Sequence, residues 1–199
     1  MEYKMSAKES QITYIQKYVA EQMPRLAYHN VAHAQRVAHT SYFLGAIQGV
    51  NREDQFLLET AGWLHDIVYK PFAKNNEDLS AVEGERLMSL VGYTPSQIDT
   101  VKQLILSTKV SATPGNFLEQ IIKDADMWNL GTPEFFEKSE AVRSELGLPA
   151  DAKWYVGLKK LIDGQEFYTP MARQLLLPQL LANRRAADAL YNSLVIPAA

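Results

Sequence analysis

The sequence predicts an all-α fold, and we expect a single-domain helical bundle spanning residues 1–199. Apolar residues recur at intervals of three and four along most of the chain, which is the spacing of one face of an α-helix. The strict alternation of apolar and polar residues that marks a half-buried strand is hard to find. No repeat, low-complexity tract or linker marks a domain boundary. A chain of 199 residues can remove about 70% of its unfolded surface from water, so one core is sufficient.

The first two expected helices have recognisable ends. The first carries Ile15 and Val19 and stops near Pro24, because proline disfavours helical geometry in the residue before it. The second starts near Asn30 and runs to Gly49. Glycine adopts the left-handed conformation that closes a helix at little cost.

A third helix is expected to form the centre of the bundle. Asn51 is its predicted N-cap, with Asp54 as the alternative start. Residues 56–67 are apolar on nearly all sides, which is typical of a helix surrounded by others. Pro71 ends this helix or closely follows its end.

The remaining helices are expected after a loop over residues 70–76. Thr94 and Pro95 open the fifth helix, since proline is tolerated in a first turn. Pro178 lies inside the last helix and should kink it or divide it. These helices are expected over 77–91, from Pro95 through Ile105, around Leu118 to Ile122, and over 133–146, 151–162 and 170–195.

Composition excludes several classes of function. The chain has 20 Lys and Arg against 23 Asp and Glu, so bulk charge does not favour nucleic acid as a partner. Cysteine is absent, which excludes disulfides, zinc-thiolate sites, iron–sulfur clusters and thiol nucleophiles. Any bound metal must therefore be held by His, Asp or Glu. No stretch approaches the roughly 18 apolar residues of a membrane span, and no secretory signal is seen, so we expect a cytoplasmic protein without a membrane partner.

His65 and Asp66 are the most informative polar pair. They lie in the apolar run 61–69, and a buried carboxylate is costly unless it is paired or bound to a cation. Adjacent residues on a helix diverge by about 100°, so the two could share an ion only if it lay off the side of the helix. His33 on the second helix could supply a further ligand.

Other polar residues leave alternatives open. His29 could bind metal, cap the second helix or meet substrate. Asp124 and Asp126 point about 200° apart on a helix, so at most one should face a given ion. His39 lies about 240° round its helix from His33, which favours a surface or packing role.

These residues form an ordered pattern. Residues 28–33, 65–66 and 124–126 resemble the H…HD…D pattern of HD-domain metal-dependent phosphohydrolases. Residues 63–69 and 76–81 are similar to a group of predicted HD phosphohydrolases with a WFHD-type segment and a downstream NE…S segment. The resemblance covers about residues 25–130, with the C-terminal helices packing onto this core. It implies a metal site formed by His33, His65, Asp66 and Asp126.

The resemblance also implies a cofactor and a reaction. Asp126 is preferred to Asp124 because the ligand in the family is the aspartate that follows alanine. Two imidazoles and two carboxylates suit one divalent ion of Mn, Fe, Co, Ni or Zn, with Mg less favoured. Some relatives hold a second metal on extra histidines, and no histidine follows His65 here. We therefore expect hydrolysis of a phosphomonoester or phosphodiester of a nucleotide or other small phosphorylated metabolite through a metal-activated water.

Roles for the neighbouring residues follow as hypotheses. Asp66 would orient the water, and Glu77 is the candidate general base, or else an ordinary acid in a first helical turn. The candidate substrate-binding residues, each of which could equally be a solvated or structural group, are His29, Arg36, Lys70 and Lys109.

Three other interpretations of these residues remain open. One is a catalytically silent HD-fold module that senses a nucleotide or metal. Another is metal-dependent oxidation on the same scaffold, and the third is a buried hydrogen-bonded network without an ion. A homo-oligomer is compatible with the sequence.

Overall fold

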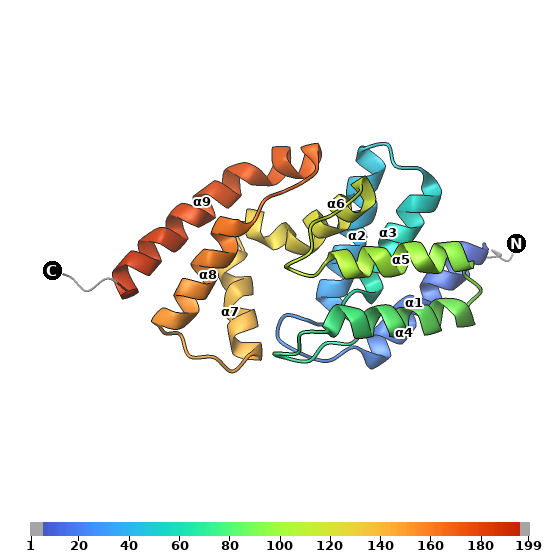
Figure 1. The fold of residues 1–199 in the computed structure, drawn as a ribbon, viewed down its shortest axis with the longest axis horizontal. Helices are drawn as coiled ribbons and strands as arrows, with labels where there is room; N and C mark the ends of the chain where they lie inside the picture. The colour runs from blue at the N-terminus through green and yellow to red at the C-terminus, as the bar shows by residue number, and fades with distance from the viewer. Residues whose placement is uncertain (1–5, 196–199) are drawn as a thin grey trace, which may run out of the picture. The chain divides into compact units, whose positions relative to one another are not determined.

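The structure, a computed structural model, describes residues 6–195, and every regular element in that range is helical (Figure 1). The predicted all-α fold is confirmed. The chain divides into two compact units, Met1–Asp126 and Met127–Ala199. The helices are α1 (Ala7–Gln22), α2 (Val31–Ile47), α3 (Arg52–Leu64), α4 (Asn76–Leu90), α5 (Pro95–Ser107), α6 (Phe117–Asp126), the 3-10 helix η1 (Met127–Gly131), α7 (Phe135–Glu145), α8 (Ala152–Gly164) and α9 (Pro170–Val195).

Helix α3 lies at the centre of the first unit, as its apolar sequence predicts. It packs most extensively against α2, and it also contacts α1, α5 and α6 (Figure 1). All its residues from Gln55 to Leu64 except Glu59 are buried. Gly62 allows the close approach of α2, because a Cβ atom at this position would lie 2.4 Å from the Cα atom of Ala38. This contact brings the start of α2 beside the end of α3.

Local capping fixes where α2 and α3 begin. The side chain of Asn30 accepts hydrogen bonds from the backbone N–H groups of Ala32 and His33. Asn51 accepts one from the backbone N–H of Asp54. Gly49 follows α2 with φ of 77°, in the left-handed region. Both helix starts and the glycine termination agree with the sequence prediction.

One sequence expectation about a helix end is wrong, and one of two alternatives for the last helix is excluded. Helix α3 was expected to continue through Ile67, but it ends at Leu64, and His65 is its C-cap. The apolar run continues beyond that point because the chain stays buried there, not because it stays helical. Pro178 was expected to kink or divide the last helix, and α9 is not divided but runs through it as one element. The missing N–H at a proline removes one hydrogen bond, and a long helix with a packed face tolerates that loss.

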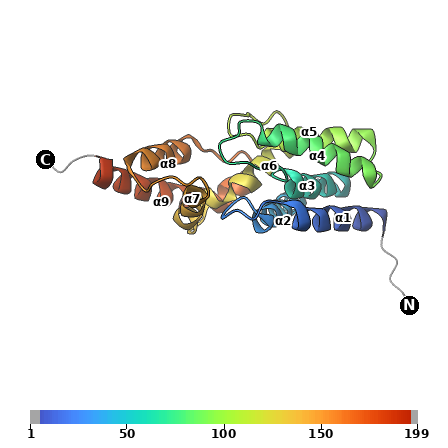
Figure 2. The same ribbon diagram turned by 90° about the horizontal axis from the view of Figure 1, so that it is seen from below.

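The second unit has a core of its own. Helix α9 packs against α8 and η1, and η1 contacts α7 (Figure 2). The largest fully buried side chains of this core are those of Phe135 and Ile162. Asn183 on α9 donates hydrogen bonds to the carbonyl oxygens of Leu130 at 2.9 Å and Thr132 at 2.8 Å, which ties the helix to the end of η1.

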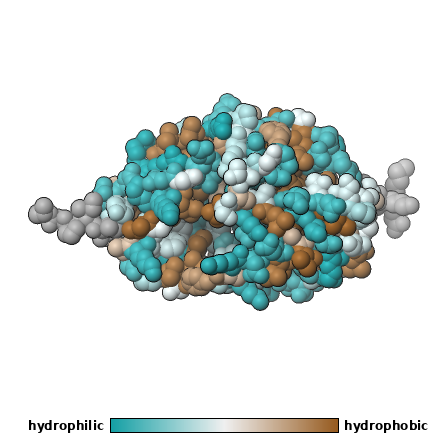
Figure 3. All heavy atoms as spheres, viewed as in Figure 1, coloured by the Kyte–Doolittle hydropathy of each residue, from teal (hydrophilic) through white to brown (hydrophobic). Residues whose placement is uncertain are grey.

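The surface carries apolar residues scattered among polar ones. In the face shown in Figure 3, small hydrophobic patches are interspersed with hydrophilic residues. Phe72 and Val110, which lie in loops of the first unit, are the two most exposed large apolar side chains of the described residues. Within those residues, no helix combines the length and the apolar character needed to cross a membrane.

Candidate metal centre

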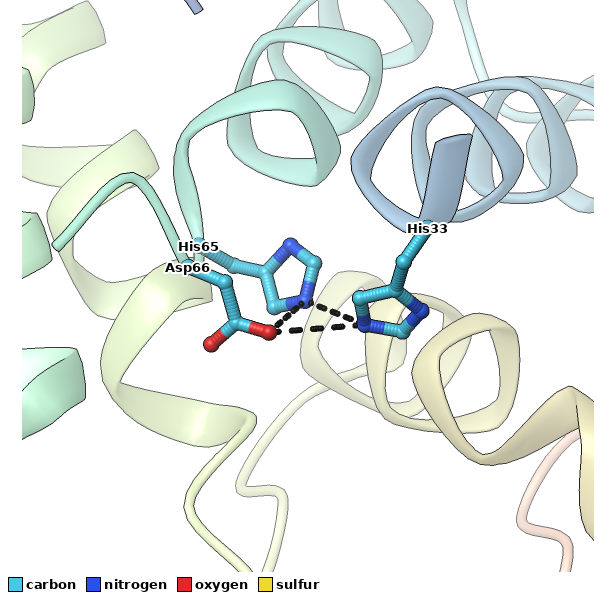
Figure 4. A group of neighbouring side chains, drawn as sticks. All are labelled: His33, His65 and Asp66. Atoms are coloured by element: carbon cyan, nitrogen blue, oxygen red, sulfur yellow. Dashed lines mark hydrogen bonds and ion pairs between the residues drawn. The ribbon is translucent and has the colours of Figure 1, made fainter. Parts of the chain in front are cut away.

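Three polar side chains meet at the contact between α2 and α3. His33 lies in the first turn of α2, and His65 and Asp66 lie in the turn that follows α3 (Figure 4). The Nε2 atoms of His33 and His65 are 3.1 Å apart. The Oδ2 atom of Asp66 lies 3.1 Å from Nε2 of His65 and 3.4 Å from Nε2 of His33. The side chains of the adjacent His65 and Asp66 thus reach one point, although neighbouring residues on a helix diverge by about 100°.

Asp126, the last residue of α6, completes the cluster. Its Oδ1 atom lies 3.3 Å from Nε2 of His33 and 3.5 Å from Nε2 of His65. Asp124, two residues earlier, is fully buried. The Nε2 atom of each imidazole therefore faces two carboxylate oxygens, and all four side chains belong to the first unit.

The spacing of these atoms fits one divalent ion. His33, His65 and Asp66 offer ligand atoms that all lie within 4.8 Å of one another. Ligand atoms about 2.0 to 2.2 Å from one ion lie roughly 3 Å apart at a right angle and roughly 3.5 Å apart at the tetrahedral angle. The separations of 3.1 to 3.5 Å observed here span that interval. The mixed nitrogen and oxygen donors suit a first-row transition metal or zinc.

The hydrogen bond of His65 also fits metal binding. Its Nδ1 atom is 2.8 Å from the carbonyl oxygen of Gly62, to which it donates. In a neutral imidazole the other nitrogen, Nε2, then carries a lone pair, and this is the atom that faces the cluster. The close packing at Gly62 thus places both the ring and the acceptor that orients it.

His33 is oriented differently. The Nη2 atom of Arg36 lies 3.0 Å from Nδ1 of His33. A guanidinium can only donate, so Nδ1 accepts, and in the neutral ring the hydrogen sits on Nε2. That hydrogen faces the carboxylate oxygens of Asp66 and Asp126, which lie 3.4 and 3.3 Å from Nε2. Binding of a cation at Nε2 of His33 therefore requires this hydrogen to leave and the bond from Arg36 to be exchanged.

The histidines and carboxylates of the cluster shift one another's pKa values. Burial alone lowers the pKa of His65, but the carboxylates of Asp66 and Asp126 outweigh it and raise that pKa well above its ordinary value. Burial alone raises the pKa of Asp66, and the neighbouring His65 and His33 reverse this and hold it well below its ordinary value. The pKa of Asp126 is lowered in the same way, by hydrogen bonds from His33 and His65 that outweigh burial. Both carboxylates are consequently ionised at neutral pH.

His29 lies at the edge of the cluster. Its Nε2 atom is 4.0 Å from Oδ2 of Asp66, and its ring is stacked on that of Tyr69 with centroids 3.7 Å apart. The cap of α2 is Asn30, so the capping role open to His29 from sequence is taken by its neighbour. His39 is exposed and meets Trp63 edge to face, as its position on the helix predicts.

The start of α4 holds the segment that follows Asp66. Asn76 accepts a hydrogen bond from the backbone N–H of Lys70 and donates one to the Lys70 carbonyl, both at 3.1 Å. Ser80 makes the same pair of bonds with Val68, at 3.1 and 3.3 Å. Sequence analysis noted Asn76 and Ser80 only through the family resemblance. Their structural role is to fix the chain on the C-terminal side of Asp66.

Lys123 is a buried cation that sequence analysis did not single out. Its ammonium group donates to the carbonyl oxygens of Ser107, at 3.3 Å, and Lys109. Burial lowers its pKa, although the negative charges of Asp126 and Glu77 act in the opposite direction. The signal in the sequence was its position three residues before Asp126, on the same face of a helix.

The other candidate substrate-binding residues have different surroundings. The ammonium of Lys109 lies 2.7 and 2.8 Å from the two carboxylate oxygens of Asp78. Lys70 is exposed, whereas Arg36 is half-buried and lies over the ring of Tyr28.

The whole-chain comparisons identify the fold. No model of a known protein family matches the sequence, and no curated protein matches it either. Among solved structures, the chain is similar to Bacillus subtilis YpgQ in complex with ADP, with a TM-score of 0.71 and 19% identity over 96% of this chain and 98% of YpgQ. A second crystal structure of YpgQ gives a TM-score of 0.69 and 20% identity over 96% and 98% of the two chains. At this level of identity, the similarity shows a shared fold.

Proposed function

We propose that this protein is an HD-type metal-dependent phosphohydrolase that cleaves a phosphomonoester or phosphodiester of a nucleotide or other small phosphorylated metabolite. The observation that carries the proposal is the convergence of Nε2 of His33, Nε2 of His65 and Oδ2 of Asp66, with separations of 3.1 to 3.4 Å. Oδ1 of Asp126 lies 3.3 and 3.5 Å from the two Nε2 atoms. Such a group of donors from separate elements is what one divalent ion requires.

In this proposal the protein's own residues have distinct tasks. A divalent ion held by His33, His65, Asp66 and Asp126 would lower the pKa of a bound water and polarise the phosphate group. Asp66 faces the histidines through Oδ2, so its Oδ1 atom is available to accept a hydrogen bond from the attacking water. Glu77, next to the anchoring residue Asn76, is the proposed general base.

The proposed substrate is a nucleotide. YpgQ, which shares the fold, was solved with ADP. His29, Arg36 and Lys70 supply donors for phosphate oxygens, with His29 at the edge of the cluster. Lys109 would join them only by exchanging its bond with Asp78 for one to phosphate.

A matched pair of variants tests the proposal. The wild-type protein with Mn should hydrolyse at least one member of a panel of nucleotides and simple phosphate esters, and it should bind one ion per chain by elemental analysis. Asp66→Ala should lower the rate by at least about a hundredfold. His39→Ala, which changes an exposed histidine, should leave the rate unchanged. Absence of metal-dependent turnover over the whole panel would refute the proposed phosphohydrolase activity.

A second candidate is a module that binds a nucleotide without turnover. The favouring observation is the network of Arg36, the two histidines and the two carboxylates, in which each Nε2 atom faces carboxylate oxygens without an ion. Calorimetry separates the candidates, because this one gives saturable binding of ADP, unaffected by metal, by a protein that shows no hydrolysis.

A further inference from the structure

Phe72 combines an unfavourable backbone conformation with an exposed ring. It lies in a turn over residues 70–73, in which the N–H of Ala73 donates to the carbonyl oxygen of Lys70 at 3.1 Å. Its φ angle is 64°, and among the described residues other than glycine it is the one with a positive φ. The side chain is 68% exposed, so burial of the ring does not explain the choice of residue.

Turn chemistry does not explain the residue either. A turn with Pro71 at its second position and a positive φ at its third ordinarily carries glycine or asparagine there, since a Cβ atom is disfavoured in the left-handed region. A large aromatic residue at Phe72 weakens the turn and adds apolar surface in contact with water. A strained residue that persists despite such costs indicates a function.

The turn is anchored at its first residue, and it directly follows residues that contact the candidate metal centre. Asn76 holds both backbone groups of Lys70 at 3.1 Å, and the ring of Pro71 fixes its own φ. Tyr69 stacks on His29, whose Nε2 atom is 4.0 Å from Asp66. Phe72 follows Tyr69 by three residues, so their Cα atoms are at most about 11 Å apart.

The charge around the ring favours an anionic ligand that also has a flat apolar part. Lys70 and Lys74 flank the turn, and both are exposed. The backbone of Lys70 is fixed by Asn76, whereas its ammonium can follow a phosphate. A nucleotide combines these two properties, since its phosphates are separated by a ribose from an aromatic base.

We propose that Phe72 is a base-stacking residue that selects nucleotides over other phosphate esters, an inference that rests on the proposed function. A nucleobase lying on the exposed ring removes apolar surface from water on both partners. The bonds that anchor the start of the turn reduce the backbone entropy that binding would otherwise remove. Stacking uses the face that every base has, so the residue selects for the presence of a base and weakly for its identity.

Three substitutions at this position test the inference. Phe72→Gly should raise the KM for ADP about tenfold and weaken ADP binding in calorimetry by a similar factor, with kcat little changed. Hydrolysis of inorganic pyrophosphate, which has no base, should be unaffected. Phe72→Leu should behave as Phe72→Gly does towards ADP, and Phe72→Trp should retain tight binding and show fluorescence quenching on addition of ADP that the wild type lacks.

Stability measurements separate ligand binding from a structural role. Glycine suits a positive φ, so Phe72→Gly should keep or raise the thermal midpoint while it weakens nucleotide binding. Val110→Ala is the matched control, because Val110 is an equally exposed apolar loop residue, and it should change neither quantity.

The outcomes also distinguish the two proposals. If the wild type hydrolyses both ADP and pyrophosphate and Phe72→Gly leaves the KM for ADP unchanged, the stacking role is wrong and the hydrolase stands. If the wild type binds ADP without hydrolysis and Phe72→Gly weakens that binding, the hydrolase is wrong and the stacking role stands. Failure of the wild type to bind ADP at all overturns the stacking role.

Discussion

His33 is the residue on which the two states of the candidate centre differ. On one side its Nδ1 atom accepts from Arg36, and on the other its Nε2 atom faces His65 and the two carboxylates. When Nδ1 accepts from Arg36, the neutral ring carries its hydrogen on Nε2. When Nε2 binds an ion, the hydrogen must instead lie on Nδ1. Arg36 thus favours the proton-bound state both by its hydrogen bond and by its positive charge near the site.

Removal of Arg36 should strengthen metal binding. In Arg36→Gln the positive charge is lost, and the amide can accept a hydrogen bond from Nδ1 of His33, which leaves the Nε2 lone pair for the ion. We expect Mn or Zn affinity to rise about tenfold, or about 1.4 kcal/mol, in isothermal titration calorimetry. Arg52→Gln makes the same charge change at a surface residue that bonds Tyr42, and it should have no effect. Weaker binding by Arg36→Gln would mean that Arg36 supports the metal-bound state.

The pKa shifts in the cluster predict how the stability of the metal-free protein depends on pH. The pKa values of Asp66 and Asp126 are lowered from 3.8 in the folded protein. Their contribution to the free energy of unfolding is therefore complete above pH 3.8 and is lost as pH falls through the folded-state pKa values. The pKa of His65 is raised from 6.5, so its contribution is complete below 6.5 and is lost as pH rises through the raised value. The cluster should therefore stabilise the fold most between about pH 4 and 6.5.

Denaturant unfolding in the presence of a chelator, at a series of pH values, measures this dependence. The difference between wild type and Asp66→Asn should be largest within that window and shrink on both sides of it. Asp99→Asn, at an exposed position, should give a difference that does not vary with pH in this way. A constant difference for Asp66→Asn would show that its charge is not coupled to His65.

The residues of the candidate centre could be singled out because their types and order are visible in the sequence. A buried carboxylate beside a histidine, with few other histidines in the chain, leaves few alternatives. The orientation of the rings could not be predicted, because it depends on the Gly62 carbonyl and on Arg36. Phe72 was missed for a similar reason, since its backbone angle has no signal beyond the preceding proline.

At the scale of the helices, the contact between α2 and α3 fixes the geometry of the centre. The caps at Asn30 and Asn51 and the glycine after α2 were predictable because they depend on residues a few positions away. The end of α3 was not, because no glycine or proline marks it. It is fixed instead by hydrogen bonds from α4. The hydroxyl of Ser80 accepts one from the backbone N–H of Val68 and donates one to the Val68 carbonyl. Those bonds replace the helical ones that a longer α3 would make.

Gly62→Ala should force α2 and α3 apart. The added Cβ atom would lie 2.4 and 2.5 Å from backbone atoms of Ala38, so one helix must move. We expect a loss of stability of about 1 to 3 kcal/mol and weaker metal binding, because His33 and His65 lie on opposite sides of this contact. Gly84→Ala is the control, since a Cβ atom there makes contacts no closer than 3.4 Å. Equal stability of the two variants would mean that the close approach is not required.

For the whole molecule, the boundary between the two compact units has no linker. Helix α6 ends at Asp126, the last residue of the first unit, and η1 begins at Met127. Domain boundaries ordinarily fall in exposed, flexible segments rich in proline, glycine and polar residues. Asp126, a candidate metal ligand, is the last residue of one unit and is followed directly by a helix of the next, so the single domain over residues 1–199 stays a prediction.

Cooperative unfolding is the test of a single domain. Gly62→Ala changes the first unit, and Gly157→Ala changes α8 in the second, where a Cβ atom meets nothing within 4 Å and alanine favours the helix by about 0.5 to 1 kcal/mol. In one domain, calorimetry gives a single transition, which Gly62→Ala moves down and Gly157→Ala moves up. In two domains each substitution moves only its own transition. Because Asp126 lies at the boundary, adding Mn to a single-domain protein should raise the one midpoint for both variants, by an amount that follows the metal concentration.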